Sequence, residues 1–499
     1  MSNRISFEVK SSSTASNTEI VAVYQDGSKK PVLPKSGFPK TLTKFVERLK
    51  KSGAFSAGNR STQFIRFGGS KGSENVLFVG MGIAKDSSAE RARGAGGTAC
   101  VKLLGEKADK VTIYADSFGE NALELAAAFV EGIALRAYNF DKYLSKREDL
   151  SLTKVTLVTA NKKLAEELGV KLKEISAMID SVNLVRDFSN EPSNIGTPEY
   201  FANQAKKLAR EYGVKCTVMS EAQCVKEKMN LFIGVGIGSD REGKVVILEY
   251  TPKGVKDAKT LALVGKGITF DTGGISIKPS LRMEEMKHDM TGAATMIGAT
   301  LLAAKLKVPT KIVCVVGFTE NMPSGTAICP GNIIYGRNGK SVEILNTDAE
   351  GRLILADLLD LAQDWKPDAI IDAATLTGAV SVALGRQACA ILGNDEDLIA
   401  QTIDAGKAVG ERIWQLPLWD EYFEDMKSEC ADMRNVANDA QGGTIRGAIF
   451  MKQFIKPGMK WAHLDIAGTA TDMGHIPYYP RKGAAGIYVR SLVELAKRF

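Results

Sequence analysis

The sequence predicts an α/β protein with two domains. Short apolar segments of strand length alternate with helical stretches, a pattern typical of a sheet covered by helices. The chain has 499 residues, which is more than one ordinary domain holds. Its hydrophobic content of 44% and charged content of 25% are ordinary for a globular protein. We therefore expect a smaller N-terminal α/β domain over residues 1–165 and a larger C-terminal domain over residues 166–499.

The N-terminal domain is expected to hold a mainly parallel sheet. Its apolar strand candidates are residues 19–23, 76–80, 111–115 and 155–159. Helical stretches at 88–104 and 121–138 lie between them, and a helical linker over 162–186 leads into the second domain. Strands that alternate with helices favour parallel pairing, because a parallel connection has to cross back over the sheet.

The C-terminal domain repeats this alternation and is expected to be an α/β/α sandwich around a central mixed sheet. Its strand candidates are residues 245–250, 260–264, 311–316, 342–345, 369–373 and 389–392. The last stretch, 486–499, has apolar residues at helical spacing and predicts a helix that docks on the domain.

Residues 346–352 read Asn-Thr-Asp-Ala-Glu-Gly-Arg and carry the clearest chemical pattern. Asp348, Glu350 and Arg352 occupy alternate positions, so an extended segment would point all three side chains the same way. An apolar strand precedes them and an apolar helix (353–361) follows, which places them at the edge of the sheet where ligands bind. A solvated turn with an Arg–carboxylate pair is the alternative.

Two further segments supply charged side chains. In Val-Gly-Lys-Gly-Ile-Thr-Phe-Asp-Thr-Gly-Gly (264–274), a strand leads Lys266 and Asp271 into a glycine-rich loop, and Lys278 follows. The glycine spacing is not that of a P-loop. In Met-Lys-His-Asp-Met-Thr-Gly-Ala-Ala (286–294), Asp289 opens a helical stretch that reaches Lys305. An ordinary first-turn acid that stabilises the helix dipole is the alternative for Asp289.

Four carboxylates gathered in one dry pocket repel one another unless cations neutralise them. Oxygen-rich ligand sets suit Mn²⁺, Mg²⁺ or Zn²⁺, and carboxylates shared by two ions make a hydrolytic centre. The chain has three histidines, no His-Glu-x-x-His and no Cys-x-x-Cys. A His-ligated zinc protease or a His-dependent nucleophile is therefore disfavoured.

At these residues the chain resembles the leucyl (cytosol) aminopeptidase family, in its bacterial form. The three segments match the motifs of that family, and Asn-Thr-Asp-Ala-Glu-Gly-Arg-Leu is its signature. Further matches are residues 190–194, 320–325, 372–378 and 463–470. The segment Thr-Ile-Arg-Gly-Ala (444–448) departs from the family pattern, which is rich in alanine there.

The resemblance implies two metal sites filled by Mn²⁺ or Zn²⁺. One would use Asp271, Asp348 and Glu350, and the other Lys266, Asp271, Asp289 and Glu350. A lysine ligand has to bind as the neutral amine, so a salt bridge from Lys266 to one of these acids stays the alternative.

The resemblance also implies the catalytic residues and the substrate. Lys278 would stabilise the oxyanion, and Arg352 would hold a bicarbonate ion that shuttles the proton. The side-chain pocket maps onto Met286, Thr375, Gly378 and Ala467. We therefore expect an aminopeptidase that releases leucine and other apolar residues from peptides with a free N-terminus.

The remaining expectations concern the setting of the protein. The family resemblance implies a homo-hexamer. Seven scattered cysteines and the absence of an apolar leader or membrane-length apolar stretch favour a cytoplasmic protein without a membrane partner. The net charge of +7 is modest, and no basic stripe supports DNA binding, although some family members bind DNA. A non-catalytic DNA-site-organising protein and a two-metal phosphoesterase are the alternative functions.

Overall fold

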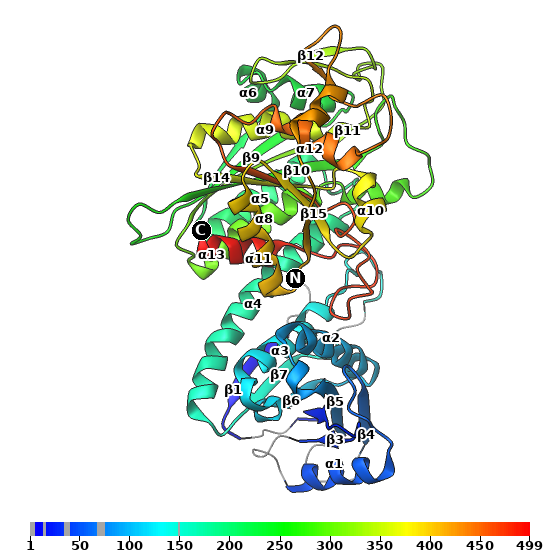
Figure 1. Cartoon of the computed structure of the whole chain (residues 1–499), viewed down its shortest axis with the longest axis vertical. Helices are drawn as coiled ribbons and strands as arrows, with labels where there is room; N and C mark the ends of the chain where they lie inside the picture. The colour runs from blue at the N-terminus through cyan, green and yellow to red at the C-terminus, as the bar shows by residue number, and fades with distance from the viewer. Residues whose placement is uncertain (1–4, 13–15, 34–39, 67–74, 148–149) are drawn as a thin grey trace. The chain divides into compact units, whose positions relative to one another are not determined.

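The computed structural model describes residues 5–12, 16–33, 40–66, 75–147 and 150–499 (Figure 1). The chain divides into two compact units, and both are α/β as predicted. The first unit is Met1–Asp180 with Met473–Arg481, and the second is Ser181–Asp472 with Lys482–Phe499. The predicted boundary at 165/166 falls inside helix α4 (Lys162–Asn190), which contributes residues to both units.

The sheet of the first unit has seven strands in the order β1-β7-β6-β2-β5-β4, with β3 paired to β2. The pairs β1–β7, β7–β6, β6–β2 and β2–β5 are parallel, which confirms the mainly parallel sheet. The strands are β1 (Ser6–Lys10), β2 (Thr18–Gln25), β3 (Pro31–Val32), β4 (Thr62–Arg66), β5 (Asn75–Ile83), β6 (Lys110–Tyr114) and β7 (Lys154–Val158). All four predicted strands are present, and β1, β3 and β4 were not predicted.

Helices of the first unit are α1 (Lys40–Ser52), α2 (Ala89–Gly105), α3 (Ala122–Arg136) and the first part of α4, with short 3₁₀ segments η1 (Ala84–Asp86) and η2 (Ala115–Asn121). Helix α2 begins where predicted, because the Ser88 side chain accepts a hydrogen bond from Arg91 N and caps it. Helix α1 was not predicted.

The central sheet of the second unit has eight strands in the order β16-β15-β18-β14-β10-β11-β9-β8. Strands β11, β10, β14 and β18 are parallel neighbours, whereas β9 pairs with β11 and β15 with β18 in the antiparallel sense, so the sheet is mixed as predicted. The strands are β8 (Lys215–Met219), β9 (Lys244–Tyr250), β10 (Thr260–Asp271), β11 (Lys311–Asn321), β14 (Ala369–Ala374), β15 (Cys389–Gly393), β16 (Ile413–Gln415) and β18 (Trp461–Asp465).

Helices cover both faces of this sheet (Figure 1). One layer contains α7 (Asn230–Gly236), α9 (Gly351–Ala362) and α12 (Gly443–Lys452). The other contains α5 (Pro198–Tyr212), α8 (Thr291–Leu306), α11 (Glu396–Val409) and α13 (Val489–Arg498). Shorter elements are α6 (Glu221–Lys226), α10 (Gly378–Leu384), η3 (Met283–His288), η4 (Gln363–Trp365) and η5 (Asp420–Met426). The docking helix predicted at 486–499 is α13.

Residues 342–345 were predicted to form a strand of the central sheet, and that prediction was wrong. Strand β13 (Ser341–Glu343) instead belongs to a separate three-stranded sheet with β12 (Ile333–Tyr335) and β17 (Met433–Arg434). An apolar run indicates burial but does not identify the sheet in which it is buried.

Strand β10 is longer than predicted, because it continues through Lys266 to Asp271 instead of ending at 264. Lys266 and Asp271 therefore stand on the strand and not on a loop. Gly265 brings α8 close to this strand, since a Cβ at residue 265 would lie 2.7 Å from Ala293 Cα. This contact fixes the segment that carries Asp289 against the strand that carries Lys266.

All seven cysteines lie in the described part of the chain and are unpaired. Within the described ranges, every helix is too short or too polar to span a membrane.

Candidate metal centre

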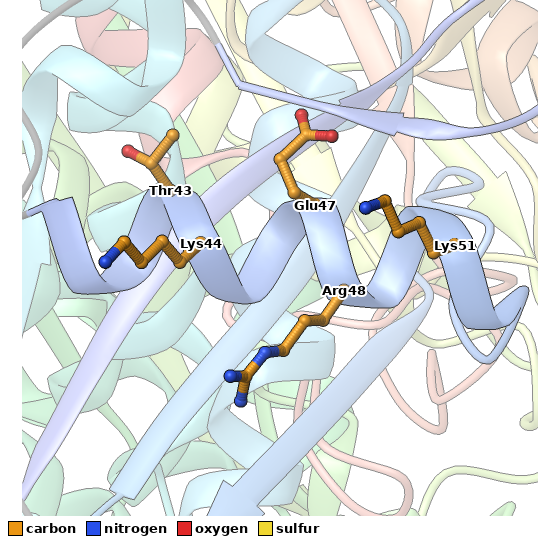
Figure 2. A pocket seen from close by; sticks show the side chains of 5 residues that line it. All are labelled: Thr43, Lys44, Glu47, Arg48 and Lys51. Atoms are coloured by element: carbon orange, nitrogen blue, oxygen red, sulfur yellow. The ribbon is translucent and has the colours of Figure 1, made fainter.

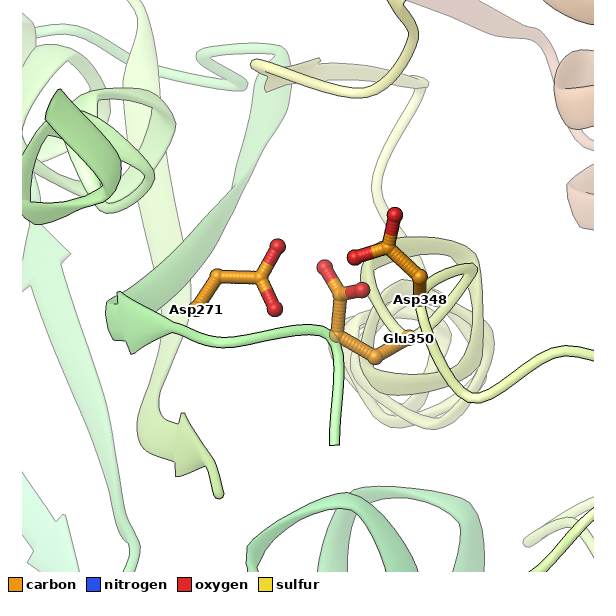
Figure 3. A group of neighbouring side chains, drawn as sticks. All are labelled: Asp271, Asp348 and Glu350. Atoms are coloured by element: carbon orange, nitrogen blue, oxygen red, sulfur yellow. The ribbon is translucent and has the colours of Figure 1, made fainter. Parts of the chain in front are cut away.

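Three predicted carboxylates meet at the edge of the central sheet. Asp271 is the last residue of β10, and Asp348 and Glu350 lie in the turn between β13 and α9. One oxygen of each carboxylate lies within 4.8 Å of the others. Figure 3 shows the three side chains turned toward one another.

Two lysines form ion pairs with these carboxylates, and one of them also contacts Asp289, the fourth predicted carboxylate. Lys266 Nζ lies 2.8 Å from Asp289 Oδ2 and 2.8 Å from Glu350 Oε1. Lys278 Nζ lies 2.7 Å from Asp271 Oδ2 and also pairs with Asp348. Six of the seven charged residues singled out from the sequence therefore form one cluster.

The seventh residue, Arg352, points elsewhere, so the idea of one extended wall was wrong. Residues 346–350 form a turn in which Asn346 Oδ1 accepts from Asp348 N at 2.9 Å, and α9 starts at Gly351. Arg352 is on that helix, and its Nη1 donates to the Asn435 carbonyl at 2.7 Å. Among the described residues, the Nε atom of this buried guanidinium has no hydrogen-bond partner.

Burial sets the electrostatics of the cluster. The side chains of Lys266 and Glu350 are 4% and 2% exposed, whereas that of Asp348 is 31% exposed. Burial raises the pKa of Glu350 and of Asp289, and the nearby charge of Asp271 raises both further. For Lys266 burial alone lowers the pKa, but the three surrounding carboxylates outweigh it, so the net pKa is raised.

The donor set fits divalent cations. Four carboxylates face two ammonium groups, which leaves an excess of negative charge at a largely buried place. The buried oxygens Asp289 Oδ2 and Asp348 Oδ1 are each contacted by one lysine ammonium, Lys266 and Lys278, and have no other hydrogen-bond partner among the residues that the structure describes. Hard oxygen donors of this kind suit Mn²⁺, Mg²⁺ or Zn²⁺. In this structure Lys266 forms salt bridges with Asp289 and Glu350, which was the alternative to metal ligation. To bind a metal ion, its ammonium group would have to lose a proton.

Gly351 makes room for the Lys266 side chain. A Cβ at residue 351 would lie 2.8 Å from Lys266 Nζ. Because two ion pairs hold that ammonium, the clash could not be relieved by a free swing of the lysine. The glycine of the signature motif therefore lets the turn close over the strand.

Three polar residues that sequence reasoning did not single out support the cluster and the segments that carry it. Asn321 Nδ2 donates to Asp271 Oδ1 at 2.8 Å and to Thr347 O at 3.0 Å. Thr347 Oγ1 donates to the Gly273 carbonyl at 2.6 Å. Asn321 and Thr347 lie inside motifs that match the family, so the motifs were the available signal. Asn435, which receives Arg352, lies in no such motif.

The four predicted pocket residues have different environments. Thr375 Oγ1 donates to Asp289 Oδ1 at 2.8 Å, and the Thr375 carbonyl accepts from Lys266 Nζ at 3.1 Å, so Thr375 is part of the cluster. Gly378 is exposed at the start of α10, with open space where a Cβ would be. Ala467 is half-buried against the core, and Met286 is half-buried in η3.

A hollow of about 490 Å³ on helix α1 lies in the first unit (Figure 2). Its lining residues are Thr43, Lys44, Glu47, Arg48 and Lys51. Three cations and one acid on an exposed helix face are an ordinary solvated surface. The hollow contains none of the clustered carboxylates, all of which belong to the second unit.

Comparison with known proteins gives the family. The model of the cytosol aminopeptidase family, catalytic domain, matches residues 183–493, and that of its N-terminal domain matches residues 20–147. A probable cytosol aminopeptidase of Geotalea uraniireducens is 42% identical over 423 residues, which cover 84% of this chain and 85% of that protein. One from Syntrophotalea carbinolica is 39% identical over 484 residues, with 96% of each chain covered.

Solved structures agree with the sequence comparison. A mutant of tomato leucine aminopeptidase has a TM-score of 0.88 at 29% identity and covers 100% of this chain and 97% of its own. The bottromycin maturation enzyme BotP in complex with Mn has a TM-score of 0.84 at 30% identity, with 97% and 99% covered. The chain therefore belongs to the cytosol aminopeptidase family, and it is an aminopeptidase.

Proposed function

We propose that this protein releases N-terminal residues from peptides and needs two divalent metal ions to do so. The observation that carries the proposal is the convergence of four carboxylates and Lys266 in one buried cluster. Asp271 and Glu350 would be shared by both ions. The remaining ligands would be Asp348 at one site, and Lys266 and Asp289 at the other. The Mn complex of the similar BotP structure supports Mn²⁺ as an occupant.

Lys278 and Arg352 are the proposed catalytic residues. When bound, the metal pair would supply Lewis-acid activation of a water molecule and of the scissile carbonyl. The carboxylates of Asp271, Glu350 and Asp348 outweigh the effect of burial and raise the pKa of Lys278, which keeps its ammonium charged. That charge would stabilise negative charge developing on the scissile carbonyl oxygen.

Arg352 would hold an anion. Its guanidinium is buried, and its Nε has no hydrogen-bond partner among the described residues. A bicarbonate ion held there would supply proton transfer. Burial lowers the pKa of Arg352 to about 10, so the side chain still carries its charge at neutral pH.

The proposed substrates are peptides whose first side chain is apolar, with leucine preferred. Support comes from Met286 and Ala467, which offer apolar surface, and from the open space beside Gly378. The homo-hexamer, the cytoplasmic location and any DNA binding stay predictions. No described feature favours a phosphoesterase.

Comparing leucine p-nitroanilide with N-acetyl-leucine p-nitroanilide tests the need for a free amine. We expect kcat/KM for the acetylated substrate to be roughly 10⁴-fold lower, because a site built to bind the amine is left unpaired without it. The two substrates share leaving group and side chain, so the comparison isolates the amine. Similar rates for both would exclude the proposed exopeptidase recognition.

A further inference from the structure

Asn435 lies directly after β17, in a loop that the mechanism above does not use. It is fully buried, and its N–H donates to the Glu343 carbonyl at 2.9 Å. That hydrogen bond continues the parallel pairing of β17 with β13, the strand that leads into the signature turn. The backbone of Asn435 is therefore fixed beside the start of this turn.

Both the oxygen and the nitrogen of the Asn435 side-chain amide form hydrogen bonds with the backbone of the turn. Its Oδ1 accepts from Leu345 N at 2.9 Å and from Asn346 N at 3.3 Å, and its Nδ2 donates to the Asn346 carbonyl at 2.6 Å. Asn346 Oδ1 in turn accepts from Asp348 N. The amide of Asn435 thus holds the residue that orients a proposed metal ligand.

The same residue also receives Arg352. The Asn435 carbonyl accepts from Arg352 Nη1 at 2.7 Å. This is a single anchor on a buried cation whose Nε has no partner among the described residues. One loop residue therefore fixes the position of the segment that precedes α9 and also the position of the Arg352 guanidinium at the start of α9.

We propose that Asn435 is a positioning residue for the reaction. Its side chain fixes the turn that leads to Asp348, and its carbonyl fixes the Arg352 guanidinium, so the positions of these two groups relative to each other are set by one residue. The inference rests on the proposed function, because it assigns Asn435 an effect on catalysis that is exerted through Arg352. A misplacement of about 1 Å in such a group can cost roughly 10²-fold in rate.

The test is a double-mutant cycle with Asn435→Ala and Arg352→Ala, assayed on leucine p-nitroanilide with saturating Mn²⁺. Alanine keeps the backbone carbonyl that accepts from Arg352, but it removes the side-chain hydrogen bonds that fix residue 435 beside the turn. With the carbonyl no longer held in place, Asn435→Ala is expected to lower kcat by roughly 10- to 100-fold and to change KM by less than about 2-fold. In the Arg352→Ala background the same substitution should lower kcat by less than about 3-fold, because the group it positions is gone.

Asn394→Ala is the matched control. Asn394 clamps another loop of the same unit with the same two atoms, since Oδ1 accepts from Trp461 N at 2.8 Å and Nδ2 donates to Met459 O at 2.9 Å. It belongs to no part of the proposed machinery, so Asn394→Ala should leave kcat unchanged. Thermal unfolding of each variant identifies any loss that comes from instability.

Asn435→Asp is the second variant, for the case that the alanine protein does not fold. It keeps an acceptor for Leu345 N and Asn346 N, but it turns an oxygen toward the Asn346 carbonyl and adds a buried charge, so a loss of kcat with the same non-additivity is expected. Unchanged kcat in a folded variant, or losses that multiply in the cycle, would overturn the inference. An inactive wild-type protein would instead overturn the proposed function, and this inference with it.

Discussion

Replacing Asp271 with asparagine is expected to lower kcat/KM by roughly 10³-fold or more while the protein stays folded. Asp271, like Glu350, is a proposed ligand of both metal ions. Its oxygens also receive Asn321 Nδ2 and Lys278 Nζ, so it connects the support of the cluster with a proposed catalytic residue. Asparagine keeps the shape and removes the charge.

Asp404→Asn is the control for this substitution. Asp404 is an exposed acid on α11 that pairs with Lys407, and its replacement makes the same change in net charge. Activity should stay within about 2-fold of wild type, as expected for an exposed pair. Mn²⁺ titration followed by calorimetry should show weakened binding for Asp271→Asn alone. An Asp271→Asn protein with more than about a tenth of wild-type activity would contradict the shared-ligand assignment.

The second large effect concerns stability and a buried group outside the site. Asp372→Ala is expected to destabilise the second unit by about 3–5 kcal/mol. Asp372 and His463 are both fully buried, with Oδ1 of the acid 2.6 Å from Nδ1 of the ring. Asp372 Oδ2 also accepts from Trp461 Nε1 at 2.7 Å, so the variant leaves two buried donors without a partner.

This destabilisation should depend on pH. Burial lowers the pKa of His463, but Asp372 outweighs burial and raises it above its ordinary 6.5. The ion pair therefore contributes fully below about pH 6.5, and its contribution is lost as the pH rises through the folded-state pKa. The difference in free energy of unfolding between wild type and Asp372→Ala should therefore become smaller at high pH. What remains there is the contribution of the hydrogen bond from Trp461 Nε1 to Asp372.

Tryptophan fluorescence is a suitable probe for that measurement. The chain has four tryptophans, and all of them (Trp365, Trp414, Trp419 and Trp461) lie in the second unit. Urea unfolding followed in this way reports the second unit alone. Asp404→Ala, which removes an exposed pair, should cost less than about 1 kcal/mol. A destabilisation by Asp372→Ala no larger than that control would mean that the buried pair adds nothing to stability.

The fold class was predictable because local patterns decide it. Apolar strands that alternate with helical stretches indicated two α/β domains, and the helical stretch predicted to start at residue 88 is α2, whose N-terminus the Ser88 side chain caps. Strands β1 and β4 are short, half-exposed edge strands, so they lack the continuous apolar run that reveals a buried strand. The pairing of β13 with β17 joins segments about ninety residues apart, which no local pattern encodes.

The candidate cluster was predictable as a set of residues but not as a geometry. The motifs identified Lys266, Asp271 and Glu350, and the structure brings their side chains together. The motif spacing suggested an extended wall, whereas Asn346 closes a turn and Arg352 joins the helix that follows. Asn435 was beyond sequence reasoning, because its importance comes from a long-range contact with that turn.

The peptidase activity is expected to depend on metal ions held by this cluster. The most direct measurement is hydrolysis of leucine p-nitroanilide by chelator-stripped protein while Mn²⁺ is titrated back. We expect the activity to be lost when the metal is removed and to return when Mn²⁺ is added. The stripped Asp271→Asn variant is not expected to regain activity on addition of Mn²⁺. Full activity in the stripped protein, or no activity at saturating Mn²⁺ or Zn²⁺, would contradict the account.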